Sequence, residues 1–502
     1  MILGLLFAGS VFFCDAQKNT DPVVFGNSIK SEDCQKYLYH IAGPAFEGRE
    51  TATPGQRLAA SYIEDYFKTL GLKPGNKDSF QQAYPVYQDS LLSTAVHLNG
   101  ESFELNKDFD IHLSNAYSVS FGVSEIVFAG YGISDSLQDD YKGLQVQGKI
   151  VLVFNGYPPA LLQSLINRKS FNAYAKQDAA QQHGAAALFI IQEDFPRKGV
   201  PDLGKMYRKY FIPKIRPVSF YISERMARTI MGPDYDRAKT GLPESKTYSM
   251  DVWLSIQKQT KMMQSTNVLG YLEGSDLRDQ LLVISAHYDH LGKKDSVIYY
   301  GADDDGSGTV SLFELAAAFS KAKAAGKGPR RSILFLANSG EEKGLWGSEY
   351  YTEHPVYPLD KTTADLNIDM IGRRDPARKQ GDSNNYVYIV GDDKLSTDLR
   401  LISMEMNKKY AGLELDYKFN DPRDPLRIFS RSDHYNFARR GVPIIFYFDG
   451  VHADYHQPSD TPDKINYDLL VKRAKLIFYT AWEMANRNNM LKRDLPAVTG
   501  ER

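Results

Sequence analysis

Five metal-binding side chains and one further glutamate lie in five short motifs of the C-terminal half of the chain. The motifs span residues 285–290 (SAHYDH), 301–308 (GADDDGSG), 338–342 (NSGEE), 367–370 (NIDM) and 454–456 (DYH). Carboxylate and imidazole groups in such a mixture suit zinc. Two zinc ions a few ångströms apart can hold a water between them and polarise a carbonyl group. Together, the motifs predict a two-zinc hydrolytic site.

The first motif supplies an imidazole and a nearby acid. His287 follows a predicted strand at residues 281–285, and Asp289 comes two positions later. An acid that reaches the ring of a zinc-binding histidine fixes its tautomer and raises its basicity. The loop could bring Asp289 to His287 in this way, whereas His290 is interpreted as structural. Taken alone, the segment could also be a polar strand end without metal.

The second and third motifs place acidic residues side by side. Asp303, Asp304 and Asp305 stand next to glycines, where their mutual repulsion would be relieved by a shared cation. Glu341 and Glu342 allow one glutamate to bind metal while the other holds the attacking water, provided that its proton affinity is raised. The alternatives are a solvated acidic turn for the aspartates and an ordinary helix start for the glutamates.

The last two motifs complete the ligand inventory. Asp369 closes a predicted strand at residues 364–371. His456 lies in a loop rich in turn residues, and most loop histidines have no special role. Here it supplies the last ligand that the other motifs lack.

The elements that must position these residues alternate between strands and helices after Asn267. Strands are predicted at 281–285, 332–337, 364–371 and 443–448, and helices at 309–323 and 467–486. This alternation indicates an α/β fold with a mostly parallel, twisted sheet and helices on both faces. Sites in such sheets lie beyond the carboxyl ends of the strands. His287, Glu341 and His456 each follow a predicted strand.

The rest of the chain suggests a second domain. Residues 56–70 form a predicted helix with an apolar stripe. By contrast, the runs at 125–129, at 149–154 and around 184–191 predict short strands. We therefore expect a signal peptide at 1–16, a catalytic domain formed by 17–90 and 263–502, and a strand-rich insert at 91–262.

Composition excludes some classes of function. The 502 residues carry a net charge of -2, from 60 basic and 62 acidic side chains, so nothing in the overall charge supports nucleic-acid binding. The basic pair Arg330 and Arg331 is expected at a solvated strand edge. No transmembrane segment is expected in the mature chain, and the oligomeric state is left open.

The amino terminus indicates export. Residues 1–13 are apolar and uncharged, too short to span a membrane but typical of a secretory signal, although no basic residue precedes them. Ala16 offers a cleavage site, and lipid attachment at Cys14 is the alternative. Cleavage would leave Cys34 as the only cysteine, expected to be a buried thiol. Export without disulfides favours a bacterial periplasm, cell surface or secreted location.

These motifs resemble the di-zinc aminopeptidase family of metallopeptidase clan MH, which includes secreted bacterial leucyl aminopeptidases and glutamate carboxypeptidase II. The resemblance covers most of the mature chain. Residues 46–50 (FEGRE) with Gly55, and 71–74 (GLKP), resemble the helical lead-in of these enzymes. The insert, with GKIVLV at 148–153 and HGA at 183–185, resembles a protease-associated domain.

The resemblance implies a role for each motif residue. His287 and Asp369 would bind one zinc, Glu342 and His456 the other, and Asp304 would bridge both. Glu341 would be the general base, Asp289 would orient His287, and Tyr455 would steady the oxyanion. The family often has a cis peptide bond after the bridging aspartate. Ser432-Asp433-His434 matches a family segment near the site. Its role is open, and packing or support of the metal ligands is expected rather than catalysis.

The resemblance therefore implies an exported exopeptidase that holds two Zn²⁺ ions per chain and hydrolyses the N-terminal bond of peptides. Its catalysts would be a metal-bridged water and the base Glu341. One alternative is a carboxypeptidase or dipeptidase on the same scaffold. A second is a glutaminyl cyclase, which uses one zinc and does not need a bridging ligand. A third is a non-catalytic receptor-like protein, although every motif residue is present.

Overall fold

The computed structural model describes residues 21–113, 116–136, 138–158, 173–196, 203–209, 215–241 and 244–498. The signal peptide expected at 1–16, with Cys14, lies outside these residues. The chain folds as two compact units, one made of Met1–Tyr84 and Gln264–Arg502 and the other of Pro85–Met263. Within the described ranges, no helix is long and apolar enough to cross a bilayer.

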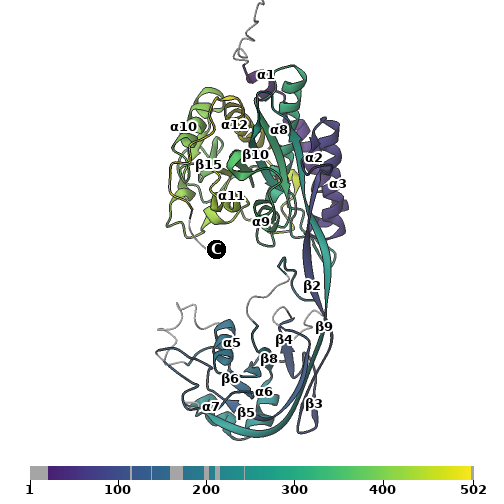
Figure 1. Ribbon diagram of the computed structural model, residues 1–502, viewed down its shortest axis with the longest axis vertical. Coiled ribbons are helices and arrows are strands. Elements are labelled where there is room, and N and C mark those ends of the chain that lie inside the picture. Colours follow the sequence, from purple (N-terminus) through teal and green to yellow (C-terminus); the bar gives the residue numbers. More distant parts are fainter. Residues whose placement is uncertain are drawn as a thin grey trace, which may run out of the picture. The chain divides into compact units, whose positions relative to one another are not determined.

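The first unit is built on a mixed sheet (Figure 1). The strand order is β16 (Glu414–Asp416), β15 (Tyr386–Val390), β17 (Ile444–Phe448), β14 (Thr362–Ile368), β10 (Leu277–His287), β13 (Arg331–Asn338) and β9 (Lys246–Leu272). The central strands β17, β14, β10 and β13 are parallel, and β15 and β9 run antiparallel to their neighbours in this group. The short strand β1 (Lys73–Pro74) pairs with β9.

Side chains alternate between the two faces of this sheet. On β10, Leu282 and Ile284 join a core with the helices of one face, whereas Leu281 and Val283 join the core of the opposite face. The first face is covered by α8 (Gly308–Ala324) and α12 (Tyr467–Asn486), with α1 (Val23–Gly26), α2 (Ser31–Ile41) and α3 (Pro54–Thr69) packed around them. The second is covered by α9 (Trp346–Glu353) and α11 (His434–Arg439). The predicted α/β fold is thus confirmed, because strands buried on both faces need helices on each side.

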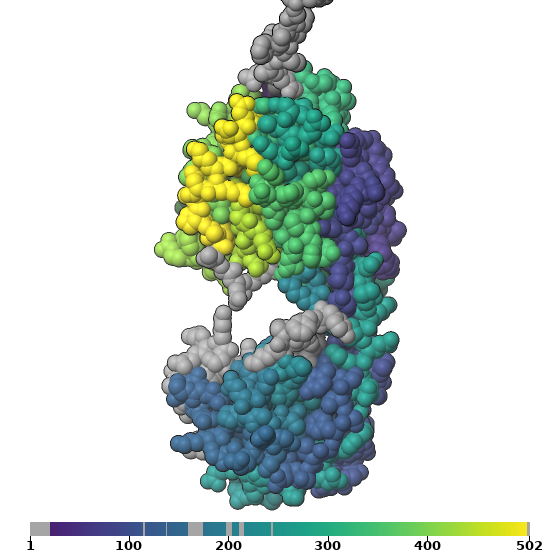
Figure 2. Space-filling model, in the orientation of Figure 1, coloured from purple at the N-terminus to yellow at the C-terminus, as the bar shows by residue number. Residues whose placement is uncertain are grey.

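Residues from both ends of the chain build this unit, as the purple and the green-to-yellow atoms of Figure 2 show. The boundaries follow local signals. Asn466 caps α12 by accepting a hydrogen bond from the Leu469 amide (3.2 Å), and Thr53 caps α3 by accepting one from the Gln56 amide (3.4 Å). Helix α12 has the predicted bounds, whereas β14 ends at Ile368 and so leaves Asp369 in the loop beyond it. Helix α10 (Thr397–Met406) lies beside α12.

The prediction for Arg331 was wrong. Its side chain is buried rather than solvated, and its guanidinium donates hydrogen bonds to the carbonyl oxygens of Met484, Arg487 and Asn488. Arg331 therefore anchors the end of α12 to β13, a contact between segments about 150 residues apart in the chain. Cys34 is a buried free thiol, as expected.

The second unit has its own sheet, in the order β9, β5 (Val119–Phe128), β6 (Ile150–Phe154), β7 (Ala187–Ile191), β8 (Val218–Ile222) and β4 (Phe109–Ile111). Strands β5 to β8 are parallel. Strands β6, β7 and β8 are buried throughout, whereas β5 is buried at its carboxyl end, residues 126–128. Strand β2 (Gln81–Leu98) pairs with β3 (Glu101–Phe103), and the helices among the described residues of this unit include α5 (Ala173–Gln182), α6 (Glu224–Met231) and α7 (Asp234–Thr240). Strands β2 and β9 each pass from one unit into the other.

Candidate active site

The sequence motifs meet at the carboxyl ends of the parallel strands in the first unit. His287 is the last residue of β10, and Asp369 directly follows β14. Glu341 comes three residues after the end of β13. Asp304 lies in the turn that leads into α8, and His456 lies in the loop after β17. A parallel sheet places such positions at one edge, which explains why residues up to 169 positions apart converge.

One group of possible metal ligands consists of His287, Asp304 and Asp369. The His287 Nε2 atom lies 3.3 Å from Asp304 Oδ1 and 3.5 Å from Asp369 Oδ1. This nitrogen is buried and makes no hydrogen bond with any described residue. Burial opposes protonation of the ring, yet the Asp369 carboxylate and its acidic neighbours raise the pKa of His287 well above its usual value. Such an atom among carboxylates is placed to receive a cation.

A second group surrounds the other oxygen of Asp304. His456 Nε2 lies 3.1 Å from Asp304 Oδ2 and 3.1 Å from Glu342 Oε2. His290, interpreted from the sequence as structural, also belongs here, since His290, Asp304 and Glu342 form a possible metal-binding group. Its Nδ1 lies 2.7 Å from Glu342 Oε1, and both atoms are buried.

The separations fit metal ligands. Two atoms bound to one tetrahedral ion at about 2.0–2.1 Å stand about 3.3 Å apart, close to the 3.1–3.5 Å found in the pairs above. Asp304 turns one oxygen toward each group, the arrangement expected of a bridging carboxylate. The peptide bond between Asp304 and Asp305 is cis. The donors of nitrogen and oxygen suit zinc in both groups.

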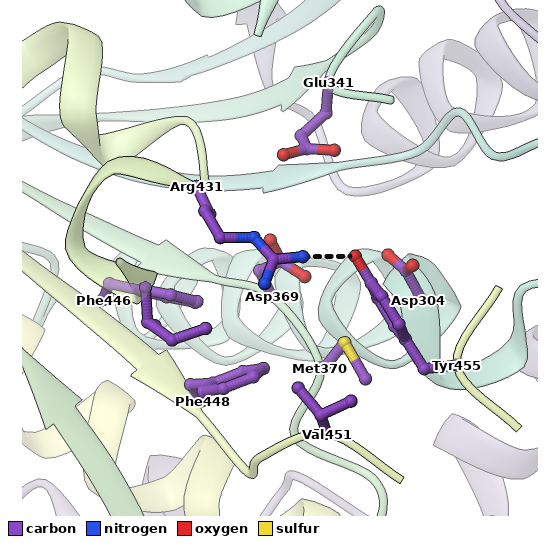
Figure 3. Close-up of a pocket in the computed structure, with 10 residues that line it drawn as sticks. Asp304, Glu341, Asp369, Met370, Arg431, Phe446, Phe448, Val451 and Tyr455 are labelled. Atoms are coloured by element: carbon purple, nitrogen blue, oxygen red, sulfur yellow. Dashed lines mark hydrogen bonds between the residues drawn. The ribbon is translucent and has the colours of Figure 1, made fainter. Parts of the chain in front are cut away.

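Glu341 belongs to neither group. Its Oε2 lies 3.9 Å from His287 Nε2, and its carboxyl faces the pocket beside the site (Figure 3). Burial raises the pKa of Glu341 well above its usual range, and the Asp369 and Glu342 carboxylates raise it further. Gly340 precedes it with φ 72°, and a Cβ there would lie 2.6 Å from the Tyr84 hydroxyl. The turn that presents Glu341 therefore needs glycine.

Asp289 contacts His287 differently from the expected geometry. The His287 Nδ1 atom lies 3.1 Å from the main-chain carbonyl oxygen of Asp289, whereas the Asp289 carboxylate is 3.7 Å away. The carboxylate instead accepts hydrogen bonds from the Thr51 hydroxyl (2.8 Å) and from the Glu341 amide (3.2 Å). One residue thus contacts both the His287 ring and the turn that carries Glu341.

Tyr455 stands at the rim of the site. Its ring stacks on that of His456 with centroids 3.9 Å apart, and its hydroxyl accepts a hydrogen bond from Arg431 Nη2 (3.1 Å; Figure 3). Burial raises the pKa of Tyr455 well above its usual value, with further contributions from Asp304 and Glu342. The phenol is therefore neutral at physiological pH and can donate a hydrogen bond.

A pocket opens beside the metal-binding groups, and Figure 3 shows its side chains. Its polar lining consists of Asp304, Glu341, Asp369, Arg431 and Tyr455, and its apolar lining of Met370, Ile428, Phe446, Phe448 and Val451. In the close-up, Phe446, Phe448 and Val451 lie on one side of the Arg431 guanidinium, and Glu341 lies on the other. The pocket can therefore hold an apolar group next to the carboxylates.

Sequence reasoning missed the residues that support Asp304 from behind. Asp460 Oδ2 accepts hydrogen bonds from the amides of Asp303 (3.0 Å) and Asp304 (3.2 Å), and His452 Nε2 lies 3.1 Å from Asp303 Oδ2. Arg49 is buried and donates to the carbonyl oxygens of Tyr288 and Gly301, near the first two motifs. Arg49 stands in the FEGRE segment, the only signal in the sequence that pointed to it.

The Ser432-Asp433-His434 segment packs beneath the site. Asp433 accepts a hydrogen bond from the Ser348 hydroxyl (2.5 Å), and its burial raises its pKa to about 6. His434 is buried, its Nε2 lies 2.8 Å from the Phe429 carbonyl oxygen, and its ring stacks on Phe446. Burial lowers the pKa of His434 to about 3, so this histidine is neutral.

Comparison with known proteins shows that part of this unit is similar to a peptidase family. Residues 267–481 match Peptidase family M28. A probable leucine aminopeptidase of Arthroderma otae is 30% identical over 217 residues, which cover 42% of this chain and 56% of that protein. Leupeptin-inactivating enzyme 1 of Streptomyces exfoliatus is 28% identical over 207 residues, covering 37% of this chain and 42% of that protein. The chain thus aligns with about half the length of these curated relatives.

Solved structures share the fold over most of the chain. An aminopeptidase from Aneurinibacillus sp. strain AM-1 aligns with a TM-score of 0.55 at 18% identity, covering 95% of this chain and 100% of that one. A zinc aminopeptidase from Bacillus subtilis, BSAP, aligns with a TM-score of 0.51 at 18% identity, covering 93% and 99%. These structures share the fold, and the resemblance inferred from the motifs is confirmed by the match of residues 267–481 to Peptidase family M28.

Proposed function

Since residues 267–481 match Peptidase family M28, we propose that the protein is a zinc-dependent aminopeptidase that removes the N-terminal residue of peptides. The observation that carries the proposal is the position of Asp304. Its two carboxylate oxygens each face a separate group of nitrogen and oxygen ligands. A bridging acid between two such groups is the arrangement that a pair of metal ions requires.

Two zinc ions would be held by residues of this chain. His287 and Asp369 would bind one, Glu342 and His456 the other, and Asp304 both. His290 is a further candidate ligand of the second group, because its Nδ1 lies 2.7 Å from Glu342 Oε1. Zinc bound there would polarise the scissile carbonyl group and lower the pKa of the attacking water.

Glu341 would serve as general base. It is close to the ligands without belonging to them, and its raised pKa suits a group that takes a proton from water and returns it to the leaving amine. Tyr455 would donate its hydroxyl proton in a hydrogen bond to the oxygen on which negative charge develops. Asp289 would fix the position of the Glu341 turn relative to the His287 ring, because it contacts both.

The substrate would bring a free amino terminus and an apolar side chain. Asp304, Glu341 and Asp369 line the pocket and could accept charge-assisted hydrogen bonds from an ammonium group. The phenylalanines and aliphatic side chains on the other side of the pocket would take an apolar side chain, since burial of apolar surface is favourable there.

A panel of chromogenic aminoacyl reporters tests this proposal. Leucyl and phenylalanyl reporters should be cleaved, glutamyl and lysyl reporters should be poor substrates, and N-acetylated leucyl reporters should not be cleaved. Cleavage of acetylated and free reporters at equal rates would refute an aminopeptidase. The enzyme stripped of zinc by a chelator is the control. Activity that persists in this preparation would come from a contaminating peptidase.

Arg431 favours a second candidate, a carboxypeptidase or dipeptidase on the same scaffold. Its exposed guanidinium lines the pocket and could bind a substrate carboxylate in a bidentate manner. Dipeptides with a free and with an amidated carboxyl terminus separate the two functions. An aminopeptidase should cleave both, whereas a dependence on the free carboxylate that is lost in Arg431→Gln would establish the second candidate.

Export and the identity of the second unit are also proposals. The apolar residues 1–13 support a secretory signal and an extracytoplasmic location in a bacterium. The motifs at 148–153 and 183–185 support a protease-associated insert, for which the sequence boundaries are 91 and 262. A zinc count of about two per chain would also distinguish the proposed enzyme from a glutaminyl cyclase, which uses one.

A further inference from the structure

A second cavity of about 630 Å³ lies between the segment that follows Asp369 and the start of α12. Its lining includes three basic residues, Arg373, Arg374 and Lys464. It shares no lining residue with the pocket of Figure 3. Nothing in the proposed peptidase reaction uses these three side chains, so the cavity needs an explanation of its own.

One of the three basic residues of this cavity has no carboxylate partner among the described residues. Arg373 Nη2 lies 2.8 Å from Asp454 Oδ2 and its Nη1 lies 3.8 Å from Asp460 Oδ1, and Lys464 Nζ lies 2.7 Å from Asp454 Oδ1. Arg374 is exposed and takes part in no ion pair with the residues that the structure describes. Asp468 also lines the cavity, and its Oδ1 accepts a hydrogen bond from the Ser31 hydroxyl. Arg374 is thus the basic side chain of this lining that is left without an ion pair among the described residues.

The walls of the cavity are held by buried contacts. The Asn466 amide donates to the Gly372 carbonyl oxygen (2.8 Å), which joins the two segments that line it. The guanidinium of the fully buried Arg473 donates to the carbonyl oxygens of Ile371 and Arg373, each at 2.8 Å. The amino end of α12, a helix of 20 residues, adds a partial positive charge beside the three basic residues. The basic groups are therefore presented by a fixed backbone.

The cavity is connected to the catalytic loop through Asp454. This residue directly precedes Tyr455 and His456, and its carboxylate is held by Arg373, Lys464 and the Ser459 hydroxyl (2.6 Å). A second anion near Arg373 and Lys464 would compete with Asp454 for their hydrogen bonds. The position of the loop would then respond, because its anchor is the same pair of cations.

We propose that this cavity is a regulatory site for a small oxyanion, a phosphate or a carboxylate, bound by Arg374 together with Arg373 and Lys464. An arginine fork matches the oxygen spacing of such anions, and a helix amino end favours negative charge. The bound anion weakens the hold of Arg373 and Lys464 on Asp454 and so changes the placement of Tyr455 and His456.

Binding is tested with inorganic phosphate on the zinc-loaded enzyme by calorimetry at constant ionic strength. Arg374→Gln should bind phosphate about tenfold more weakly or worse, since it loses a charge-assisted hydrogen bond. Arg440→Gln, which removes an equally exposed arginine outside the cavity, is the matched control and should bind as the wild type does. Phosphate held by zinc would persist in Arg374→Gln, so equal binding by the wild type and Arg374→Gln would overturn the site.

Competition with acetate distinguishes the source of the anion. Displacement of phosphate by acetate assigns the site to carboxylates as well, and failure to displace it assigns the site to tetrahedral anions. The regulatory part rests on the proposed peptidase activity. Saturating phosphate should change kcat at least about twofold in the wild type and in Arg440→Gln, but not in Arg374→Gln. An equal change in kcat in all three proteins would refute regulation through this cavity. The calorimetric test of phosphate binding is independent of that result.

Discussion

The carboxylate of Asp289 accepts a hydrogen bond from the backbone amide of Glu341, with Oδ1 and N 3.2 Å apart. The main-chain carbonyl of the same residue lies 3.1 Å from His287 Nδ1. A residue two positions after the first ligand thus also supports the turn that carries the proposed base. Disturbing Asp289 should affect zinc affinity and turnover together.

We expect Asp289→Ala to lower kcat, because the Glu341 amide loses its hydrogen-bond acceptor. It should also weaken zinc binding by about tenfold or more, because the negative charge 3.7 Å from His287 Nδ1 is removed, although the main-chain carbonyl that contacts the ring remains. Thr51→Val, which removes only the 2.8 Å hydrogen bond to Asp289, is the graded control and should have a smaller effect on both. Zinc competition with a fluorescent chelator and steady-state kinetics measure the two quantities. Wild-type values of both in Asp289→Ala would show that these hydrogen bonds do not organise the site.

Glu341 and Glu342 should fail in different ways although they are neighbours. Glu341→Gln removes the proposed base but leaves both groups of proposed ligands intact, so zinc should remain while kcat falls by about a hundredfold or more. Glu342→Gln should lose part of the zinc, because Glu342 lies 3.1 Å from His456 within the second group. Metal counting by atomic spectroscopy beside kcat separates the two. Loss of metal in Glu341→Gln, with full activity per remaining ion, would mean that the roles are reversed.

Zinc affinity should fall as the pH is lowered. Burial alone would lower the pKa of His456, but its hydrogen bonds to Asp304 and Glu342 raise that pKa to about 10. Metal must therefore displace a proton from the ring, and each such proton weakens the apparent affinity by about tenfold per pH unit below that pKa. Calorimetry in buffers of different ionisation enthalpy should detect proton release at pH 7, and activity lost to a chelator should return with zinc. Zinc affinity that stays constant from pH 6 to 8 would contradict this.

Glu314 should make stability depend on pH independently of the metal site. Burial raises its pKa from 4.5 to about 7. Below pH 4.5 the carboxyl is protonated in both the folded and unfolded states. Between these values the unfolded state ionises first, so stability falls as pH rises, by roughly 3 kcal/mol in total by pH 7.

Glu314→Gln removes this dependence. The free energy of unfolding of the variant, relative to that of the wild type, should increase from pH 5 to pH 8, because only the wild type must bury a charge at the higher pH. Urea unfolding at the two values measures the difference, in which contributions from other groups cancel. Glu405→Gln, at an exposed position, is the control. A difference between Glu314→Gln and wild type that does not change with pH would contradict the burial of an ionised Glu314.

Local patterns in the sequence were sufficient for the fold class. Short apolar runs predict the buried strands β10, β13 and β17, and apolar residues at helical spacing predict α12. Both signals depend only on residues within a few positions of one another. The candidate ligands could be recognised for the same reason, because each lies in a short motif. These motifs also carry the resemblance to the family.

Tertiary structure alone decided how those side chains meet. His290 approaches Glu342, Asp460 supports the Asp304 turn from 156 positions away, and the buried Arg331 anchors α12. The Asp289 carboxylate turns to Glu341 rather than to the ring of His287. Each of these contacts joins distant segments, and its geometry depends on how the loops close over the ends of the strands. Burying a charged group is unfavourable unless it is paired, so each buried charge lies beside a partner. Which partner is available depends on the folded interior and cannot be predicted from a local segment of sequence.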